Sequence, residues 1–175
     1  MGILQKIKMK YVDGTSDRRV AYLRRQGATI GKGTRLLCSL YSFGSEPYLV
    51  TIGEDTLISG NVSLLTHDGS VKVLNTLGYF DGERMDKIAP VVIGNNCFIG
   101  NSAKIMPGVT IGDNVIIGAC AVVTKDIPSN YVAAGVPARI ICTIDKYYKK
   151  NADRFYPTAE KTPEEKKQYL LTHIK

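Results

Sequence analysis

Residues 93–128 read IGNNCF-IGNSAK-IMPGVT-IGDNVI-IGACAV-VTKDIP, and this stretch decides the fold. An aliphatic residue opens each of the six hexads, and glycine follows it in four of them. The fifth position of each hexad is again small or aliphatic, from Cys97 in the first to Ile127 in the last. An α-helix would place successive opening residues about 240° apart, so the period excludes an amphipathic helix. Six units without a slip predict a repetitive solenoid.

Five weaker hexads precede this array and bring the total to eleven; they open at Ile30, Leu36, Ile52, Ile58 and Leu64. The register breaks twice, at residues 42–51 and at residues 70–92. Because the hexads resume after each break, both segments are expected to be insertions that project from a regular body.

Six residues suffice for one short strand and one bend. Strands of this kind can wind into coils whose opening aliphatic residues stack inward, while successive coils lie about 4.8 Å apart and pair as parallel strands. The glycine after the aliphatic residue is then needed for one of two reasons, a positive φ angle or a close backbone approach.

The flanking segments look built to protect the ends of such a stack. A capped helix is predicted from Thr15 or Ser16 up to Gly27. Thr162-Pro163-Glu164-Glu165 forms a capping box with proline at the first helical position, which predicts a second helix there. Residues 143–161 are expected to hold a further short helix and a linker.

The composition is that of a globular chain. Its 175 residues are 44% hydrophobic and carry a formal charge of +7. Neither a membrane-spanning run nor the apolar core of a secretory signal is found, so we expect a cytoplasmic protein. The four cysteines lack metal-binding spacing and are expected to be reduced thiols. The positive charge would suit nucleic acid, an anionic membrane surface or a phosphorylated ligand.

The hexads at residues 93–114 closely resemble those of the hexapeptide-repeat acyltransferases. Residues 133–139 (AAGVPAR) resemble the C-terminal signature of the branch that contains the galactoside, maltose, serine and polysaccharide O-acetyltransferases. The resemblance covers residues 28–142 and is most specific over 91–142. It implies a mainly β fold, a left-handed parallel β-helix of triangular section with three hexads per coil. It also implies a homotrimer with acetyl-CoA sites between subunits.

This fold divides the chain into three parts. Residues 1–27 form an N-terminal helical cap, and residues 28–142 form the β-helix catalytic domain with an inserted loop at 70–92. Residues 143–175 form a C-terminal helical tail.

His67 is the candidate general base. It lies where the second block of hexads ends and the long insertion begins, the setting of the family's catalytic histidine. Histidine can take a proton from an attacking hydroxyl or amine at neutral pH. The other histidine, His173, belongs to the terminal helix. The residue that orients His67 stays open between a main-chain carbonyl and the carboxylates of Asp68, Glu46, Asp81, Glu83 and Asp86.

The resemblance also assigns residues to the co-substrate. Asn101 matches the residue that stabilises the oxyanion, and Ala119 matches one that meets the pantetheine amides. Thr124 and Lys125 would lie along acetyl-CoA, and Arg139 would face its phosphates. Lys125 and Arg139 have a physical reason of their own, since cations form charge-assisted bonds with a polyanion. The family's direct attack needs no acyl-enzyme, and Cys120 carries no motif of a covalent carrier.

Four residues are candidates for the acceptor site. Ser39 stands where the sugar enzymes have an acceptor-binding asparagine, and Asp68 adjoins the base. Tyr79 and Arg84 belong to the insertion, where they could contact a sugar or pack against a neighbouring subunit.

The sequence thus predicts an acetyl-CoA-dependent O-acetyltransferase acting on a saccharide, namely a capsule or lipopolysaccharide precursor. N-acetylation of an amino sugar or nucleotide-sugar, and O-acetylation of an antibiotic-like xenobiotic, are the alternatives. No metal is expected, because the carbonic anhydrases that share the solenoid need three histidines on zinc. No nucleic acid is expected, because the basic residues match no known binding motif. Proximity of the basic flanks to a membrane surface stays open.

Overall fold

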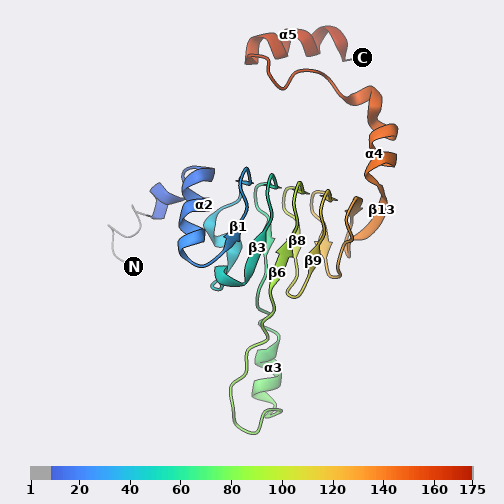
Figure 1. The fold of residues 1–175 in the computed structure, drawn as a ribbon. Coiled ribbons are helices and arrows are strands. Elements are labelled where there is room, and N and C mark those ends of the chain that lie inside the picture. The colour runs from blue at the N-terminus through green and yellow to red at the C-terminus, as the bar shows by residue number, and fades with distance from the viewer. Residues whose placement is uncertain (1–8, 175) are drawn as a thin grey trace. The chain divides into compact units, whose positions relative to one another are not determined.

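The computed structural model describes residues 9–174 and contains three sheets of short parallel strands (Figure 1). One sheet has the order β1 (Thr29–Ile30), β3 (Val50–Ile52), β6 (Val91–Ile93) and β9 (Thr110–Ile111). The next runs β2 (Arg35–Leu36), β4 (Leu57–Ile58), β7 (Phe98–Ile99), β10 (Ile116–Ile117), β12 (Tyr131–Ala134) and β13 (Arg139–Thr143). The third contains β5 (Ser63–Leu64), β8 (Lys104–Ile105) and β11 (Val122–Val123). From β3 to β11 consecutive strands enter the three sheets in turn, so the chain winds as a parallel β-helix.

The strand register confirms three hexads per coil. In the strong array Ile93 pairs with Ile111, and Ile99 pairs with Ile117. Each opening aliphatic residue therefore stacks on the one that opens the corresponding hexad of the next coil. The antiparallel strand β13 pairs with β12 and is the edge strand at that end of its sheet.

The core is a column of the hexad side chains. All eleven opening residues are at most 5% exposed, as predicted. The six residues at the fifth position of the strong hexads are buried beside them, from Cys97 to Ile127. Burying one such aliphatic side chain contributes about 1.5–3 kcal/mol, so this column is the main source of stability.

The glycines of the hexads are required by close backbone approach. A Cβ on Gly100 would lie 2.5 Å from the amide nitrogen of Ala119 and 2.7 Å from the carbonyl carbon of Gly118, in the next coil. The positive φ angles fall two positions later, for example at Asn96 (50°) and Ser102 (60°). Of the two reasons that the sequence left open, close approach is the one that applies.

Both breaks in the register are insertions. The first contains the 3₁₀ turns η1 (Leu40–Phe43) and η2 (Pro47–Leu49). The second leaves the β-helix at a short antiparallel neck, where His67 bridges Ile88. It carries helix α3 (Val71–Thr76), which lies outside the sheets (Figure 1).

Helix α2 (Ser16–Arg25) covers the first coil. The Thr15 side chain accepts a hydrogen bond from the Arg18 amide, and Gly27 follows the helix with a φ of +92°. Val20 and Leu23 are buried, so this helix covers the open edge of β1 and β2.

The described chain forms two compact units, and the boundary between them in the sequence lies between Ile144 and Asp145. The second unit contains most of α4 (Ile144–Asn151), the turn η3 (Ala152–Arg154) and α5 (Pro163–His173). Thr162 and Glu165 form the expected capping box at the start of α5.

The four cysteines are unpaired. Burial raises the pKa of the Cys38 and Cys97 thiols, which keeps them protonated and unreactive. Among residues 9–174, no helix is long and apolar enough to cross a membrane.

Gly100→Ala should lower the free energy of unfolding by about 1–3 kcal/mol, because the new methyl group meets backbone that cannot move freely. Gly69→Ala is the matched control, since a Cβ there meets no atom within 4 Å. It should change the stability by less than about 0.5 kcal/mol. Urea unfolding at equal protein concentrations measures both, and equal stability of the two variants would contradict the close-approach argument.

Candidate active site

His67 stands at the neck of the long insertion. The chain leaves β5 at Leu64, buries Thr66 and then pairs with the returning strand through the His67–Ile88 bridge. The Thr66 carbonyl accepts from the Ala89 amide at 2.9 Å. These bonds fix the backbone of His67, while its side chain is 51% exposed. The backbone of His67 is thus fixed, while its imidazole ring is accessible to a ligand.

Glu46 is the carboxylate that contacts the imidazole. Its Oε2 lies 2.9 Å from His67 Nδ1 and accepts a 2.7 Å bond from Thr66 Oγ1. Its Oε1 accepts a 2.6 Å bond from Ser45 Oγ. The bonds from Ser45, His67 and Thr66 lower the pKa of Glu46 to about 2. The carboxylate is therefore ionised at neutral pH.

This pairing decides which nitrogen of His67 carries the proton. An ionised carboxylate can only accept hydrogen bonds, so Nδ1 must donate to Glu46. In the neutral imidazole the proton then resides on Nδ1, and Nε2 has a free lone pair. Nε2 is thus the atom that can remove a proton from a substrate.

The first insertion brings Glu46 to this position. The chain turns at Gly44 with φ 62° and ψ −153°, a conformation that a side chain rarely adopts. A Cβ at Gly44 would lie 3.6 Å from Thr66 Oγ1 and 4.0 Å from His67 Cε1. The first break in the hexad register therefore supplies the partner of His67, which lies directly before the second break.

Asp68 braces the neck of the loop. Its Oδ2 accepts a 2.7 Å bond from Lys87 Nζ, and its Oδ1 accepts from the Ser70 amide at 2.9 Å. The bond from Lys87 above all holds the pKa of Asp68 well below its usual range. Of the carboxylates that the sequence left open as partners of His67, Glu46 rather than Asp68 makes the contact.

Asn101 and Ala119 lie at one corner of the β-helix. The Asn101 carbonyl accepts from the Cys120 amide at 2.8 Å, so the two turns stack coil on coil. The Asn101 side chain is exposed; its Oδ1 accepts from Ser102 Oγ at 2.8 Å. Its Nδ2 lies beside Gly60, 3.1 Å from where a Cβ would stand. An amide donor is therefore available on the outer surface of this corner.

His67 and Asn101 lie on the third sheet at opposite ends of its strands. Asn101 precedes β8 and neighbours Gly60, which precedes β5, whereas His67 follows β5. From Val62, after the turn at Asn61 (φ 57°), to His67 the chain advances about 16 Å at the rise of a strand. One chain alone does not bring the two side chains together.

The other predicted co-substrate residues are exposed. Thr124 and Lys125 follow β11, at the same edge of the third sheet as His67. Arg139 begins β13 and donates from Nη1 to the Ala138 carbonyl at 2.9 Å. The structure therefore brings Asn101 together with Ala119 and places Thr124 and Lys125 at the other edge.

The acceptor candidates lie in two places. Ser39 donates from Oγ to Asp13 at 2.8 Å and caps η1, so its hydroxyl is already used within the chain. Tyr79 (69% exposed) and Arg84 lie in the long insertion. Asp13 escaped the sequence interpretation, because no motif connects the N-terminal segment with residue 39 before the fold joins them.

Comparison with known proteins places the chain among acetyltransferases. The family described as "Bacterial transferase hexapeptide (six repeats)" matches residues 90–125. "Protein CapG" of Staphylococcus aureus is 40% identical over 154 residues, which cover 87% of each chain. Galactoside O-acetyltransferase of Escherichia coli K12 is 39% identical over 153 residues, covering 75% of this chain and 73% of that protein. The chain belongs to the hexapeptide-repeat acetyltransferases.

A solved structure supports the same assignment for the fold. Galactoside acetyltransferase in complex with coenzyme A superimposes with a TM-score of 0.60 and 32% sequence identity, over 89% of this chain and 84% of that one. That neighbour binds coenzyme A, the carrier part of the co-substrate that the sequence predicts for this acetyltransferase.

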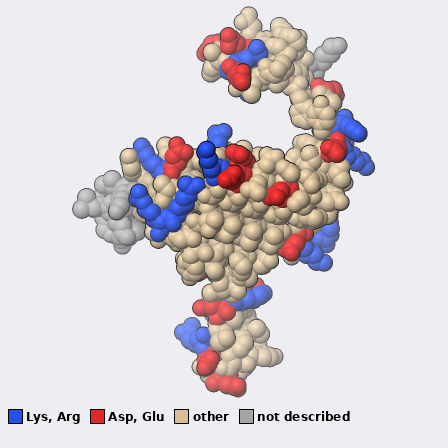
Figure 2. Space-filling model, viewed as in Figure 1, with Lys and Arg blue, Asp and Glu red and all other residues tan. Residues whose placement is uncertain are grey.

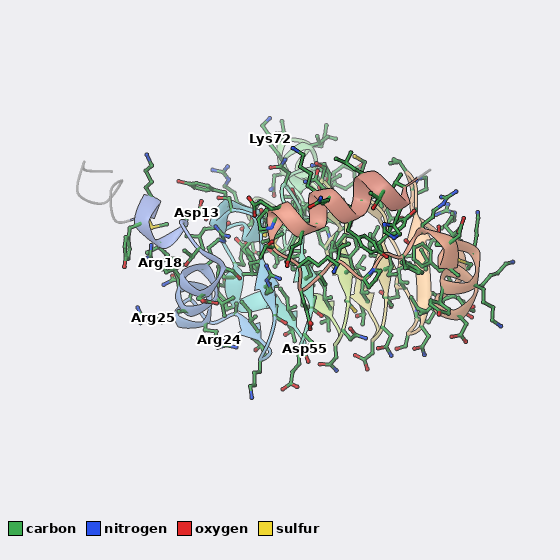
Figure 3. The ribbon with its side chains drawn as sticks, turned by 90° about the horizontal axis from the view of Figure 1, so that it is seen from above. Asp13, Arg18, Arg24, Arg25, Asp55 and Lys72 are labelled. Carbon is green, nitrogen blue, oxygen red and sulfur yellow. The ribbon has the colours of Figure 1, made fainter. Side chains whose placement is uncertain are left out.

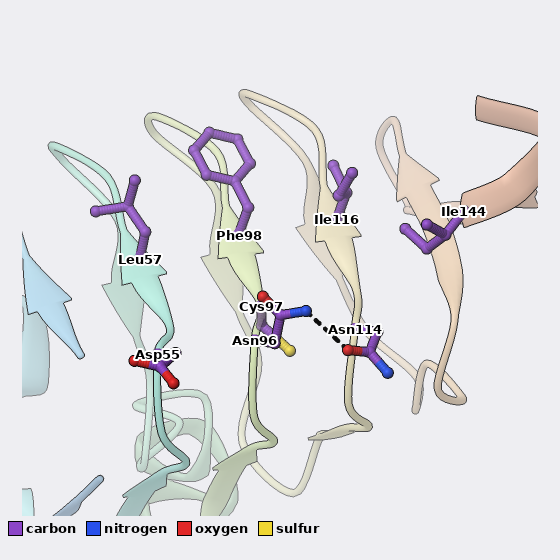
Figure 4. A pocket seen from close by; sticks show the side chains of 8 residues that line it. All are labelled: Asp55, Leu57, Asn96, Cys97, Phe98, Asn114, Ile116 and Ile144. Atoms are coloured by element: carbon purple, nitrogen blue, oxygen red, sulfur yellow. Dashed lines mark hydrogen bonds between the residues drawn. The ribbon is translucent and has the colours of Figure 1, made fainter. Parts of the chain in front are cut away.

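A hollow of about 350 Å³ on another face of the acetyltransferase lies apart from His67 (Figure 4). Leu57, Phe98 and Ile116 line it from β4, β7 and β10, and the Asn96 amide there donates to Asn114 at 2.8 Å. It contains no histidine. Among residues 9–174, no group of three or more His, Cys, Asp and Glu side chains could hold a metal ion. His67 and Glu46 therefore remain the best candidates for proton transfer.

The lowered pKa of Glu46 makes stability depend on pH. As pH falls, the unfolded state takes up the proton first, so the contribution of Glu46 is complete above about pH 5 and is lost toward pH 2. The free-energy difference between wild type and Glu46→Gln should shrink by roughly 1–2 kcal/mol between about pH 6 and pH 3. Urea unfolding across this range measures it. Glu83→Gln, at an exposed loop residue, is the control, and a constant difference for Glu46→Gln would refute the assignment.

Proposed function

We propose that this chain is an acetyl-CoA-dependent O-acetyltransferase with a left-handed β-helix, acting on a saccharide with His67 as general base. The observation that carries the proposal is the His67–Glu46 pair at the neck of the insertion. The pair fixes one tautomer and leaves Nε2 accessible, and the named relatives include a galactoside O-acetyltransferase.

The reaction follows from this geometry. Nε2 of His67 takes the proton of the acceptor hydroxyl as its oxygen attacks the thioester carbonyl. The carbonyl oxygen becomes an oxyanion, which accepts a hydrogen bond from Nδ2 of Asn101. Collapse of the tetrahedral intermediate breaks the carbon–sulfur bond, and the imidazolium returns its proton to the departing thiolate. Glu46 stabilises the imidazolium between the two transfers.

The co-substrate would lie along the corners of the β-helix. Ala119 stacks next to Asn101 and leaves room for the pantetheine arm, and Thr124 lies along it. Lys125 and Arg139 are exposed cations, which suit the phosphates of acetyl-CoA. The coenzyme A complex of the galactoside enzyme supports this co-substrate.

The active site would be completed by a second copy of the chain. His67 and Asn101 lie at opposite edges of one sheet, so a site that needs both must take the histidine from one subunit and the asparagine from the next. A closed ring of three subunits provides this contact three times, since each interface joins unlike edges. We therefore propose a homotrimer with intersubunit sites.

The acceptor would be a saccharide of capsule or lipopolysaccharide type. The similarity to the galactoside enzyme supports a sugar hydroxyl. Tyr79 and Arg84 would meet it from the insertion, with Asp68 holding the neck, whereas the Ser39 hydroxyl would first have to leave Asp13. A panel of sugars, amino sugars and hydroxylated antibiotics, assayed by thiol release, distinguishes this acceptor from the alternatives.

His67→Ala should lower kcat about 10²–10⁴-fold with the best acceptor of that panel, because the attacking hydroxyl loses its base. His173→Ala is the control: this histidine is exposed on α5 and should leave the rate within twofold of wild type. Thiol release at saturating acetyl-CoA measures both. Full activity of His67→Ala would remove the general-base role.

Mixing two inactive variants tests the intersubunit site. His67→Ala and Asn101→Ala should each be strongly impaired alone. After co-refolding in equal amounts, the mixture should regain about a quarter of the wild-type activity, because random assortment gives one interface in four both intact residues. Separately refolded and then combined samples are the control. No recovery on co-refolding would favour a site within one chain.

A further inference from the structure

The net positive charge of the chain comes from its first 35 residues. They contain nine Lys and Arg against two Asp, which accounts for the whole formal charge of +7. The other 140 residues are neutral, with fourteen basic and fourteen acidic side chains. Such an asymmetry indicates an interaction with an extended anionic partner rather than a general need for solubility.

Two arginines of this segment lie on the outer side of helix α2. On α2, Val20 and Leu23 are buried, and Arg18 and Arg25 occupy the opposite side of the helix, two turns apart. Figure 3 shows these two arginines on the side of α2 away from the sheets. In Figure 2 the blue side chains gather over this end of the β-helix. The cap thus presents a row of cations to solvent.

The structure neutralises little of this charge. Of the seven cations among residues 9–35, Arg19 is the one within 4.0 Å of a carboxylate, with Asp13 at 3.8 Å. Arg24 donates to the carbonyls of Ile30 and Gly31, which are neutral and leave its charge intact. Lys32 and Arg35 border a groove beside α2, which has a volume of about 350 Å³. The cap retains most of its charge for a partner.

Exposed tyrosines accompany the cations. Tyr11 is 62% exposed, Tyr41 78% and Tyr48 63%. Tyr41 borders a hollow with Gln26 of α2, and Tyr48 lies against Gly27 at the end of that helix. The guanidinium of Arg18 lies 3.8 Å from the ring centroid of Tyr11. Tyrosine side chains prefer the boundary between water and lipid, with the ring in the apolar layer and the hydroxyl in water.

We propose that this surface, the basic cap, binds an anionic phospholipid bilayer; it is defined by Tyr11, Arg18, Arg25, Lys32, Arg35 and Tyr41. The cations attract acidic headgroups, and the tyrosine rings enter the headgroup layer. Single-stranded nucleic acid stacks its bases on a row of free aromatic faces. Arg18 covers one face of Tyr11, which weakens that alternative, and the test below includes it.

The basic cap lies next to the candidate base. Gly44 and Ser45 border the hollow that contains Tyr41 and Gln26, and Gly44 approaches the His67 ring. On the proposed function, membrane binding would therefore hold the acceptor side of the active site close to the lipid surface. A saccharide attached to a lipid carrier is the acceptor class that this arrangement favours.

Vesicle flotation of the full chain tests the proposal without any assay of activity. Vesicles of phosphatidylcholine with about one-third phosphatidylglycerol should bind the protein at about 0.1 M salt, and binding should be lost at about 0.5 M salt. Vesicles of phosphatidylcholine alone should not bind it. The variant Arg25→Glu/Lys32→Glu/Arg35→Glu alters three exposed side chains, and it should bind at least tenfold more weakly.

The matched control is Lys149→Glu/Lys150→Glu/Lys167→Glu, which changes the net charge equally at exposed residues of the second unit. It should bind within twofold of wild type. Circular dichroism verifies that both variants fold. Equal loss of binding in the two variants would reduce the effect to net charge and overturn the proposal. The absence of binding to the anionic vesicles would also overturn it. So would a single-stranded oligonucleotide that binds the wild-type chain more tightly than the vesicles do and binds the cap variant more weakly. None of these outcomes depends on whether the chain transfers acetyl groups.

Discussion

Close contact between successive coils is the constraint on which the rest of the molecule depends. The inward column of aliphatic side chains forms only if each coil lies directly on the one before, and this spacing leaves no room for a Cβ at Gly100. Strand pairing, burial and glycine placement therefore express one requirement. The flat walls that result are rigid but chemically uniform, so reactive side chains must come from the corners and from the segments that interrupt the repeat.

Both interruptions contribute to the candidate site. The first carries Glu46, and His67 lies in the last hexad before the second; Thr66 bonds the carboxylate from within the wall between them. A regular coil could not offer this geometry, because its polar turns face outward at separate corners. The rigid stack positions the two segments, and the segments supply the proton chemistry that the stack lacks.

The sequence predicted the fold well because, within each hexad, the residue type at a position matches the burial of that position. The buried column and the helix caps follow from local spacing, and so does the position of His67 before the long loop. Three hexads per coil was implied by the resemblance to the hexapeptide-repeat family, and the strand register confirmed it. The partner of His67 could not be chosen from the sequence, because Glu46 approaches it from 21 residues away through a turn at Gly44. The separation of Asn101 from His67 likewise became visible only when strand register assigned them to opposite edges of a sheet. The sequence does not indicate which side chains a residue at a corner of the β-helix will face.

The coil register also restricts how this chain can change its length. Because Ile93 stacks on Ile111 and Ile99 on Ile117, residues added to the walls as whole turns of three hexads keep every later side chain in the column. The last coil keeps the same stacking with two residues fewer, since Ile111 faces Ile127 and Ile117 faces Ala133. A turn added after β9 would lengthen the surface available to an elongated ligand and leave the His67–Glu46 contact unaltered. The architecture therefore separates the length of the binding surface from the geometry of proton transfer, and each can diverge while the other is retained.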